Sequence, residues 1–138
     1  MGWAGPAAVS AAITTDGDVI AVAGDGGFAM TMTCVETAVE YGVAPTFVVL
    51  NDESLGMVRQ MDKSIPGVEF HDTDFLKVAE GFGAEGVRVR SPANLDETLA
   101  AAKAADAPTV VDVRIDPDEE MAENLQSSFY ESVGGLHE

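Results

Sequence analysis

The sequence predicts an α/β protein: a three-layer structure in which a parallel β-sheet is flanked by helices on both faces. Four short apolar runs, rich in β-branched residues, have the continuous pattern of strands that are buried on both sides. Segments of helical character alternate with these runs and are joined to them by short loops. At 138 residues, the chain is long enough for one domain with a sizeable core.

The first half of the chain supplies two helices and two strands. Residues 6–14 are small and alanine-rich with a proline near the first turn, which predicts a helix. Residues 19–23 are continuously apolar and predict a buried parallel strand. Residues 29–41 predict a helix that ends at Gly42, because glycine is favoured just beyond a helix. Residues 46–50 predict the neighbouring strand.

The second half repeats this alternation. Helices are predicted at 74–82 and 94–104, each opened by a polar capping residue, an aspartate and an asparagine respectively. Strands are predicted at 86–89 and 109–115. The stretch around Gly56, ahead of the first of these helices, is expected to be a loop.

The beginning of the chain lacks an element that this fold class normally has. A helix in a parallel α/β sheet usually follows a strand, yet only five residues precede the helix at 6–14. We therefore expect either a domain trimmed of its first strand or a start at Met1 that lies inside a longer domain. The domain is expected to span 1–117, followed by an acidic C-terminal tail at 118–138.

Charge and composition exclude several classes of function. The chain has 24 acidic and 7 basic residues and a net charge of −17, which opposes binding to nucleic acid or to an anionic membrane. No apolar run is long enough for a transmembrane helix, and the N-terminus has no signal-peptide pattern. The single cysteine, Cys34, is typical of a reducing cytoplasm. We expect a cytoplasmic protein.

The excess of negative charge predicts a protein from a salt-accumulating halophile. Repulsion among the carboxylates destabilises the folded chain in dilute buffer, whereas at roughly 1 M salt the screening length falls to about 3 Å. We expect the chain to unfold in low-salt buffer and to refold in molar KCl, as measured by circular dichroism. Full stability without salt would favour an ordinary acidic protein instead.

Two acidic residues mark the candidate site. Asp25 lies in Gly24-Asp25-Gly26 directly after one predicted strand, and Asp52 follows Asn51 at the end of the next, 27 positions later. One strand–helix–strand unit fills this interval, so both carboxylates are expected at the carboxyl ends of neighbouring parallel strands. The glycines permit close approach of a ligand, and the helix that follows presents N–H groups to an anion. The layout is typical of a divalent metal that holds a diphosphate.

Magnesium is the metal that this ligand set favours. Mg²⁺ prefers octahedral oxygen ligands from one or two carboxylates, backbone carbonyls, water and phosphate, and Asp25, Asp52 and a carbonyl at Ser54 supply such a set. Two other interpretations remain open from the residues alone. The glycine motif also fits a dinucleotide site, although a bare carboxylate beside a pyrophosphate is repulsive without a cation. The second interpretation is that both acids are solvated turn residues without a ligand. His71 and His137 are likewise expected to be solvated or loop histidines.

The same segment resembles the cofactor-binding motif of thiamine-diphosphate enzymes, in which GDG is followed about thirty residues later by an Asn-Asn pair. The resemblance, strongest to acetolactate-synthase-like members, covers most of residues 1–117. It is carried by these stretches: Met1-Gly2-Trp3-Ala4-Gly5-Pro6-Ala7-Ala8, Phe28-Ala29-Met30-Thr31, Thr37-Ala38-Val39, Leu50-Asn51-Asp52-Glu53-Ser54-Leu55-Gly56-Met57-Val58 and Pro108-Thr109-Val110-Val111-Asp112-Val113. It implies the thiamine-diphosphate-binding fold.

The resemblance also implies roles for individual residues. Asp25, Asp52 and the backbone oxygen of Ser54 would bind Mg²⁺, and Met1 matches the apolar residue that bends the cofactor into its reactive shape. The remaining residues implied to lie at the cofactor are Gly24, Gly26, Gly27, Asn51, Gly56, Met57 and Val58. Three departures stand out: Asp52 replaces the usual asparagine, Cys34 stands where a glutamate is common, and Met61 replaces a tryptophan found in many acetolactate synthases.

By this resemblance, we expect the chain to bind the diphosphate end of thiamine diphosphate as a subunit or fragment of a 2-oxo-acid decarboxylase or carboligase. The glutamate that activates the cofactor in this family comes from a pyrimidine-side domain, and nothing in the sequence resembles that domain. Turnover is therefore expected only with that domain on another chain or within a homo-oligomer. The alternatives are an inactive dimerising module that keeps the fold and, third, a dinucleotide-dependent oxidoreductase domain.

Overall fold

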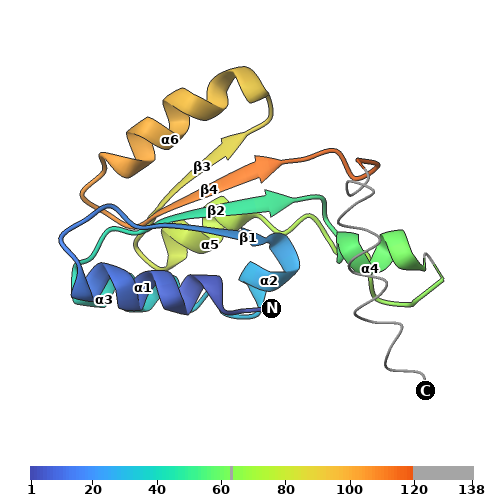
Figure 1. Ribbon diagram of the computed structural model, residues 1–138, viewed down its shortest axis with the longest axis horizontal. Coiled ribbons are helices and arrows are strands. Elements are labelled where there is room, and N and C mark those ends of the chain that lie inside the picture. Colours follow the sequence, from blue (N-terminus) through green and yellow to red (C-terminus); the bar gives the residue numbers. More distant parts are fainter. Residues whose placement is uncertain (63, 120–138) are drawn as a thin grey trace.

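The fold is a four-stranded parallel sheet between two layers of helices, as the sequence predicts (Figure 1). It comes from a computed structural model in which residues 1–62 and 64–119 are described, so the expected acidic tail lies almost wholly outside the described residues. The strands are β1 (Ile20–Gly24), β2 (Thr46–Asn51), β3 (Glu85–Val89) and β4 (Thr109–Arg114). Their spatial order is β1-β2-β4-β3, which makes β1 and β3 the edges of the sheet formed by these residues.

The helices divide between the two faces of the sheet. They are α1 (Ala4–Thr14), α2 (Asp25–Ala29), α3 (Cys34–Tyr41), α4 (Gly56–Met61), α5 (Phe75–Gly81) and α6 (Leu95–Lys103). Helices α1, α3 and α5 cover one face and α6 covers the other, while α4 lies beyond the carboxyl ends of the strands (Figure 1). Among the described residues, no helix is long and apolar enough to cross a bilayer.

The two faces hold two separate apolar clusters. On the three-helix face, Phe28 lies between Phe47 and Phe75, with ring centroids 5.9 Å and 5.5 Å apart. On the opposite face, α6 packs on side chains of β2, β3 and β4. Helix α6 does not cover edge strand β1, where Ile20 and Val22 are about half exposed.

The helix predicted at 29–41 is wrong as a single element, because the structure divides it. Helix α2 already begins at Asp25, and a turn with i to i+3 hydrogen bonds separates it from α3, including Cys34 N–H to the Thr31 carbonyl at 2.9 Å. The turn allows Phe28 of α2 and Val35 of α3 to enter the same core. The α3 C-terminus is as predicted, with Gly42 in the left-handed conformation at φ 63°.

Three further local predictions fail. The stretch after Gly56 is the helix α4 rather than a loop. Asp74 makes no side-chain cap on α5, because its carboxylate contacts Lys77 at 3.0 Å and Arg88 at 3.4 Å instead. Asn94 makes no side-chain cap on α6, since a 3₁₀ turn at Pro92–Asn94 runs directly into that helix.

Candidate functional site

Parallel pairing of β1 and β2 brings the two acidic motifs together. Gly24, the last residue of β1, is in register with Leu50 of β2, so Asp25 and Asn51 follow at the same edge of the sheet. Asp25 is buried, with 3% of its surface exposed. One of its carboxylate oxygens accepts the Gly26 N–H at 2.6 Å, and the other accepts the Ser54 N–H at 3.1 Å. The first motif is thereby tied directly to the second.

Ser54 joins the two carboxylates. Its backbone N–H donates to Asp25, and its hydroxyl donates to Oδ2 of Asp52 at 2.9 Å. Glu53, just before it, has a positive φ of 59°, which is uncommon for a residue with a side chain. This turn precedes Ser54, whose backbone N–H and hydroxyl reach the two carboxylates. The sequence motif alone does not reveal the turn.

Burial and repulsion both act on Asp25. Burial in the protein raises the pKa of its carboxyl group, and the nearby charge of Asp52 raises it further, while the hydrogen bonds from Gly26 and Ser54 oppose the shift. Among the described residues, no lysine, arginine or histidine forms an ion pair with Asp25 or Asp52. Two close carboxylates without a basic partner fit a bound cation chemically.

The rest of a metal's ligands would come from groups other than acidic side chains. Within residues 1–62 and 64–119, no three His, Cys, Asp or Glu side chains gather as a metal cluster. Mg²⁺ suits such an incomplete site because it commonly retains water and phosphate oxygens in its coordination shell. A ligand role for the backbone oxygen of Ser54 stays a prediction.

Two glycines are required by close packing around the carboxylates. A Cβ atom at Gly26 would lie 2.7 Å from Leu55 Cδ2 and 3.0 Å from Phe70 Cε2. A Cβ atom at Gly56 would collide with the Asp52 carboxylate. Any side chain at either position would therefore displace the walls of the site.

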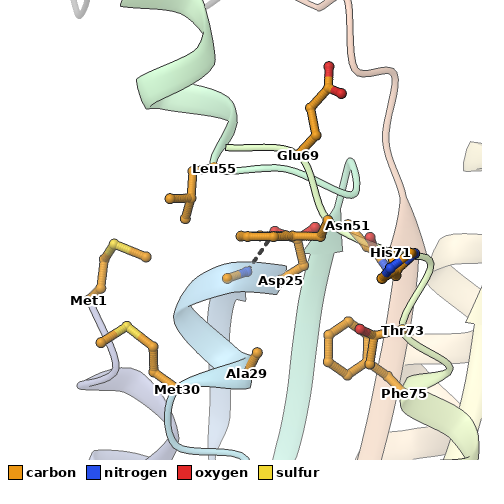
Figure 2. Close-up of a pocket in the computed structure, with 12 residues that line it drawn as sticks. Met1, Asp25, Ala29, Met30, Asn51, Leu55, Glu69, His71, Thr73 and Phe75 are labelled. Atoms are coloured by element: carbon orange, nitrogen blue, oxygen red, sulfur yellow. Dashed lines mark hydrogen bonds between the residues drawn. The ribbon is translucent and has the colours of Figure 1, made fainter. Parts of the chain in front are cut away.

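Asp25 lies between two clefts. The first, of about 780 Å³, is shown in Figure 2, where Met1 and Met30 lie on one side of Asp25 and His71 lies on the other. Gly26, Asn51 and Leu55 also line this cleft. The second, of about 1280 Å³, is lined by five more of the predicted residues: Gly24, Asp52, Ser54, Gly56 and Met57. Gly27 and Val58 line neither of these two clefts.

A segment that the sequence does not single out completes the site. Residues 68–70 run antiparallel to residues 53–55, with Leu55 N–H to the Val68 carbonyl and Phe70 N–H to the Glu53 carbonyl, both at 2.7 Å. This pairing carries Glu69, Phe70 and His71 to the first cleft. His71 is exposed and lies in a loop, as expected, and this loop borders the first cleft. No sequence motif around Phe70 predicts that this segment pairs with residues 53–55.

A buried charged network beneath the site is also absent from the sequence prediction. Asp112 is fully buried in β4 and contacts Asn51 of β2 and Arg88 of β3. The available signal is the charge itself, an aspartate in the middle of the apolar run Thr109–Arg114. A buried charge needs partners, and both partners stand on neighbouring strands.

Fold and site together define a parallel α/β domain whose acidic, glycine-lined loops meet at the carboxyl ends of two neighbouring strands. The chain belongs to the family described as thiamine pyrophosphate enzyme, C-terminal TPP binding domain, which matches residues 1–113. This match confirms the family that the sequence motifs led us to expect.

Individual relatives agree with the family. The chain is 37% identical to an acetolactate synthase of Bacillus subtilis over 121 residues, covering 84% of this chain and 21% of that protein. It is 35% identical to a probable acetolactate synthase large subunit of Methanococcus aeolicus over 124 residues, covering 85% and 21%. The chain thus spans about a fifth of the length of these relatives.

A solved structure shares the fold. It is the thiamine diphosphate-dependent 4-hydroxybenzoylformate decarboxylase of Rhodococcus jostii RHA1, with a TM-score of 0.81 and 32% identity. The similarity covers 87% of this chain and 24% of that one. The predicted class of fold is therefore confirmed.

Proposed function

We propose that this chain binds the diphosphate end of thiamine diphosphate through Mg²⁺, as part of a 2-oxo-acid decarboxylase or carboligase of the acetolactate-synthase type. The observation that supports it best is the pair Asp25 and Asp52, linked by Ser54 and without a basic partner among the described residues. The chain matches the thiamine pyrophosphate-binding family over residues 1–113, and a pair of acids of this kind is suited to a metal that holds a diphosphate.

The proposed role of each residue follows from its position. Asp25 and Asp52 hold the metal with the backbone oxygen of Ser54, and the backbone of Gly26 contacts the diphosphate. Met1 lies in the cleft beside Asp25, where an apolar side chain is suited to supporting the ring of the cofactor. When bound, thiamine diphosphate supplies an electron sink for 2-oxo acids.

Catalysis by this chain requires a partner under the same proposal. The glutamate that activates the cofactor would come from a pyrimidine-side domain, on another chain or in a homo-oligomer. The net charge of −17 supports a cytoplasmic setting with high salt and disfavours nucleic acid or membrane as a partner. Without the pyrimidine-side domain, we expect cofactor binding with little or no turnover.

Calorimetric titration in molar KCl tests the proposal. We expect thiamine diphosphate to bind in the presence of Mg²⁺ and the heat of binding to disappear when EDTA removes the metal. Binding of NADH without metal would overturn the proposal in favour of the dinucleotide interpretation. If neither ligand binds and light scattering shows a dimer, the chain is the inactive dimerising module.

A further inference from the structure

We propose that Asp112 is a positioning residue for the metal loop, acting through Asn51 and Arg114 on the turn that carries Asp52 and Ser54. The inference rests on the proposed function, because it concerns how the chain prepares its loop for Mg²⁺. Asp112 itself does not reach the candidate metal site. It lies in the middle of β4, away from the carboxyl end of that strand, and is fully buried.

The first connection runs through the amide of Asn51. Its Nδ2 donates to Oδ1 of Asp112 at 2.9 Å, and its Oδ1 accepts the Glu53 N–H at 3.1 Å. Both ends of the amide are engaged, so Asp112 fixes which end faces the loop. The bond to Glu53 closes an Asx turn, the type of turn in which a side chain replaces a backbone acceptor.

The second connection runs through Arg114 to the same residue of the loop. Its guanidinium pairs with the carboxylate of Glu53 and, through its other terminal nitrogen, with Asp72. Its Nε lies 3.7 Å from Oδ2 of Asp112 and is, among the described residues, the one buried side-chain nitrogen or oxygen without a hydrogen bond. Glu53 is thus held at its backbone by Asn51 and at its side chain by Arg114.

The result of both connections is the unusual backbone at Glu53. A positive φ is strained for a residue with a side chain, so the conformation persists only where its surroundings impose it. The turn at Glu53 then directs the Ser54 N–H to Asp25 and the Ser54 hydroxyl to Asp52. Asp112 is therefore coupled to both candidate metal ligands through hydrogen bonds.

Arg88 requires an acceptor atom on the side of residue 112 that faces it. Its Nε donates to Oδ2 of Asp112 at 2.7 Å, and a guanidinium has no acceptor atom. In Asp112→Asn, the amide at position 112 must turn its oxygen to Arg88 and its NH₂ to Asn51. Asn51 can accept from that NH₂ only by reversing its own amide, which then presents an NH₂ to the Glu53 N–H. The substitution changes no atom of the loop but breaks its turn.

The test compares Asp112→Asn with the charge-exchanged double variant Asn51→Asp/Asp112→Asn. A carboxylate at position 51 accepts from both the amide at 112 and the Glu53 N–H, so the double variant restores every hydrogen bond without changing net charge. We expect Asp112→Asn to raise the Mg²⁺ concentration for half-maximal thiamine diphosphate binding by about 10–100-fold. The double variant is judged by the protection of the Glu53 amide, which should recover, because Asn51 itself lines the cleft and a carboxylate there also changes the charge near the metal.

Amide hydrogen exchange supplies a readout that needs no cofactor. In Asp112→Asn, the amides of Glu53 and Ser54 should exchange faster, whereas those of the central strands, such as Val49 and Val111, should keep their protection. Asp74→Asn is the matched control: it removes the negative charge of the outer partner of Arg88, 3.4 Å away, and leaves the Asp112–Asn51 bond in place. It should leave both loop amides and Mg²⁺ dependence unchanged.

Several outcomes would overturn the inference. Unchanged loop protection in Asp112→Asn, or equal loss in loop and central strands without recovery in the double variant, would reduce Asp112 to a support of the sheet. If Asp112→Asn does not fold, Asn51→Ala tests the same connection, and intact protection of Glu53 would contradict it. Failure of the wild type to bind thiamine diphosphate rejects the proposed function, while the exchange rates still decide the role of Asp112.

Discussion

Asp25→Asn is expected to abolish Mg²⁺-dependent binding of thiamine diphosphate, whereas Asp52→Asn is expected to retain it. The two substitutions are chemically identical and remove one negative charge each. At position 25, both carboxylate oxygens already accept backbone N–H groups, so an amide NH₂ would oppose either Gly26 or Ser54. At position 52, an amide oxygen can still accept the Ser54 hydroxyl, and asparagine is the residue that the family resemblance leads us to expect there.

The expected size of the effect follows from general experience with metal sites. Losing an outer partner of a metal ligand typically costs about 10–100-fold in affinity, so loss of the ligand itself should exceed about 100-fold. Calorimetry with a fixed concentration of thiamine diphosphate and increasing Mg²⁺ measures it, with exchange rates of central-strand amides as the check on folding. Equal loss of affinity in both variants would contradict the distinct role of Asp25.

Phe28→Ala is expected to lower the free energy of unfolding by about 3–5 kcal/mol. Phe28 is 2% exposed and makes ring contacts with both Phe47 and Phe75, so truncation opens a cavity between α2, β2 and α5. The loss is a large share of the roughly 5–15 kcal/mol that stabilises a typical domain. Urea unfolding at constant molar KCl, followed by circular dichroism, gives the value.

Met30→Ala provides the control from the same short region. Met30 is 64% exposed, and its truncation should change the unfolding free energy by no more than about 0.5 kcal/mol. A similar effect of both substitutions would mean that the aromatic cluster around Phe28 does not anchor the helix that begins at Asp25.

The central strands were predictable because burial on both faces leaves a strong pattern in sequence. The runs at 19–23 and 46–50 differ from β1 and β2 by a single residue at their ends. Short helices near the site were not predictable in the same way. Helices α2 and α4 have 5 and 6 residues, too few to be stable alone, so contacts elsewhere in the fold determine them.

The candidate site was predictable only in its outline. Strand order places Asp25 beside Asn51, which the spacing of the motifs anticipates. The turn at Glu53 depends on Asn51 and Arg114, and both meet Asp112, which is 61 positions after Asn51. Contacts across so long an interval are set by the order of strands in the sheet, which the sequence does not give. A single aspartate in an apolar strand signals that partners exist but does not identify them.

The position of β1 at the edge of the described sheet has a consequence for how copies of this chain meet one another. Within residues 1–62 and 64–119, β1 pairs on one side only, and an edge strand with half-exposed Ile20 and Val22 is a template for intermolecular pairing and aggregation. Repulsion between molecules of charge −17 opposes such encounters in dilute buffer. Molar salt removes that repulsion along with the repulsion inside each chain. The salt concentration that would stabilise the fold would therefore also favour self-association through the edge of β1.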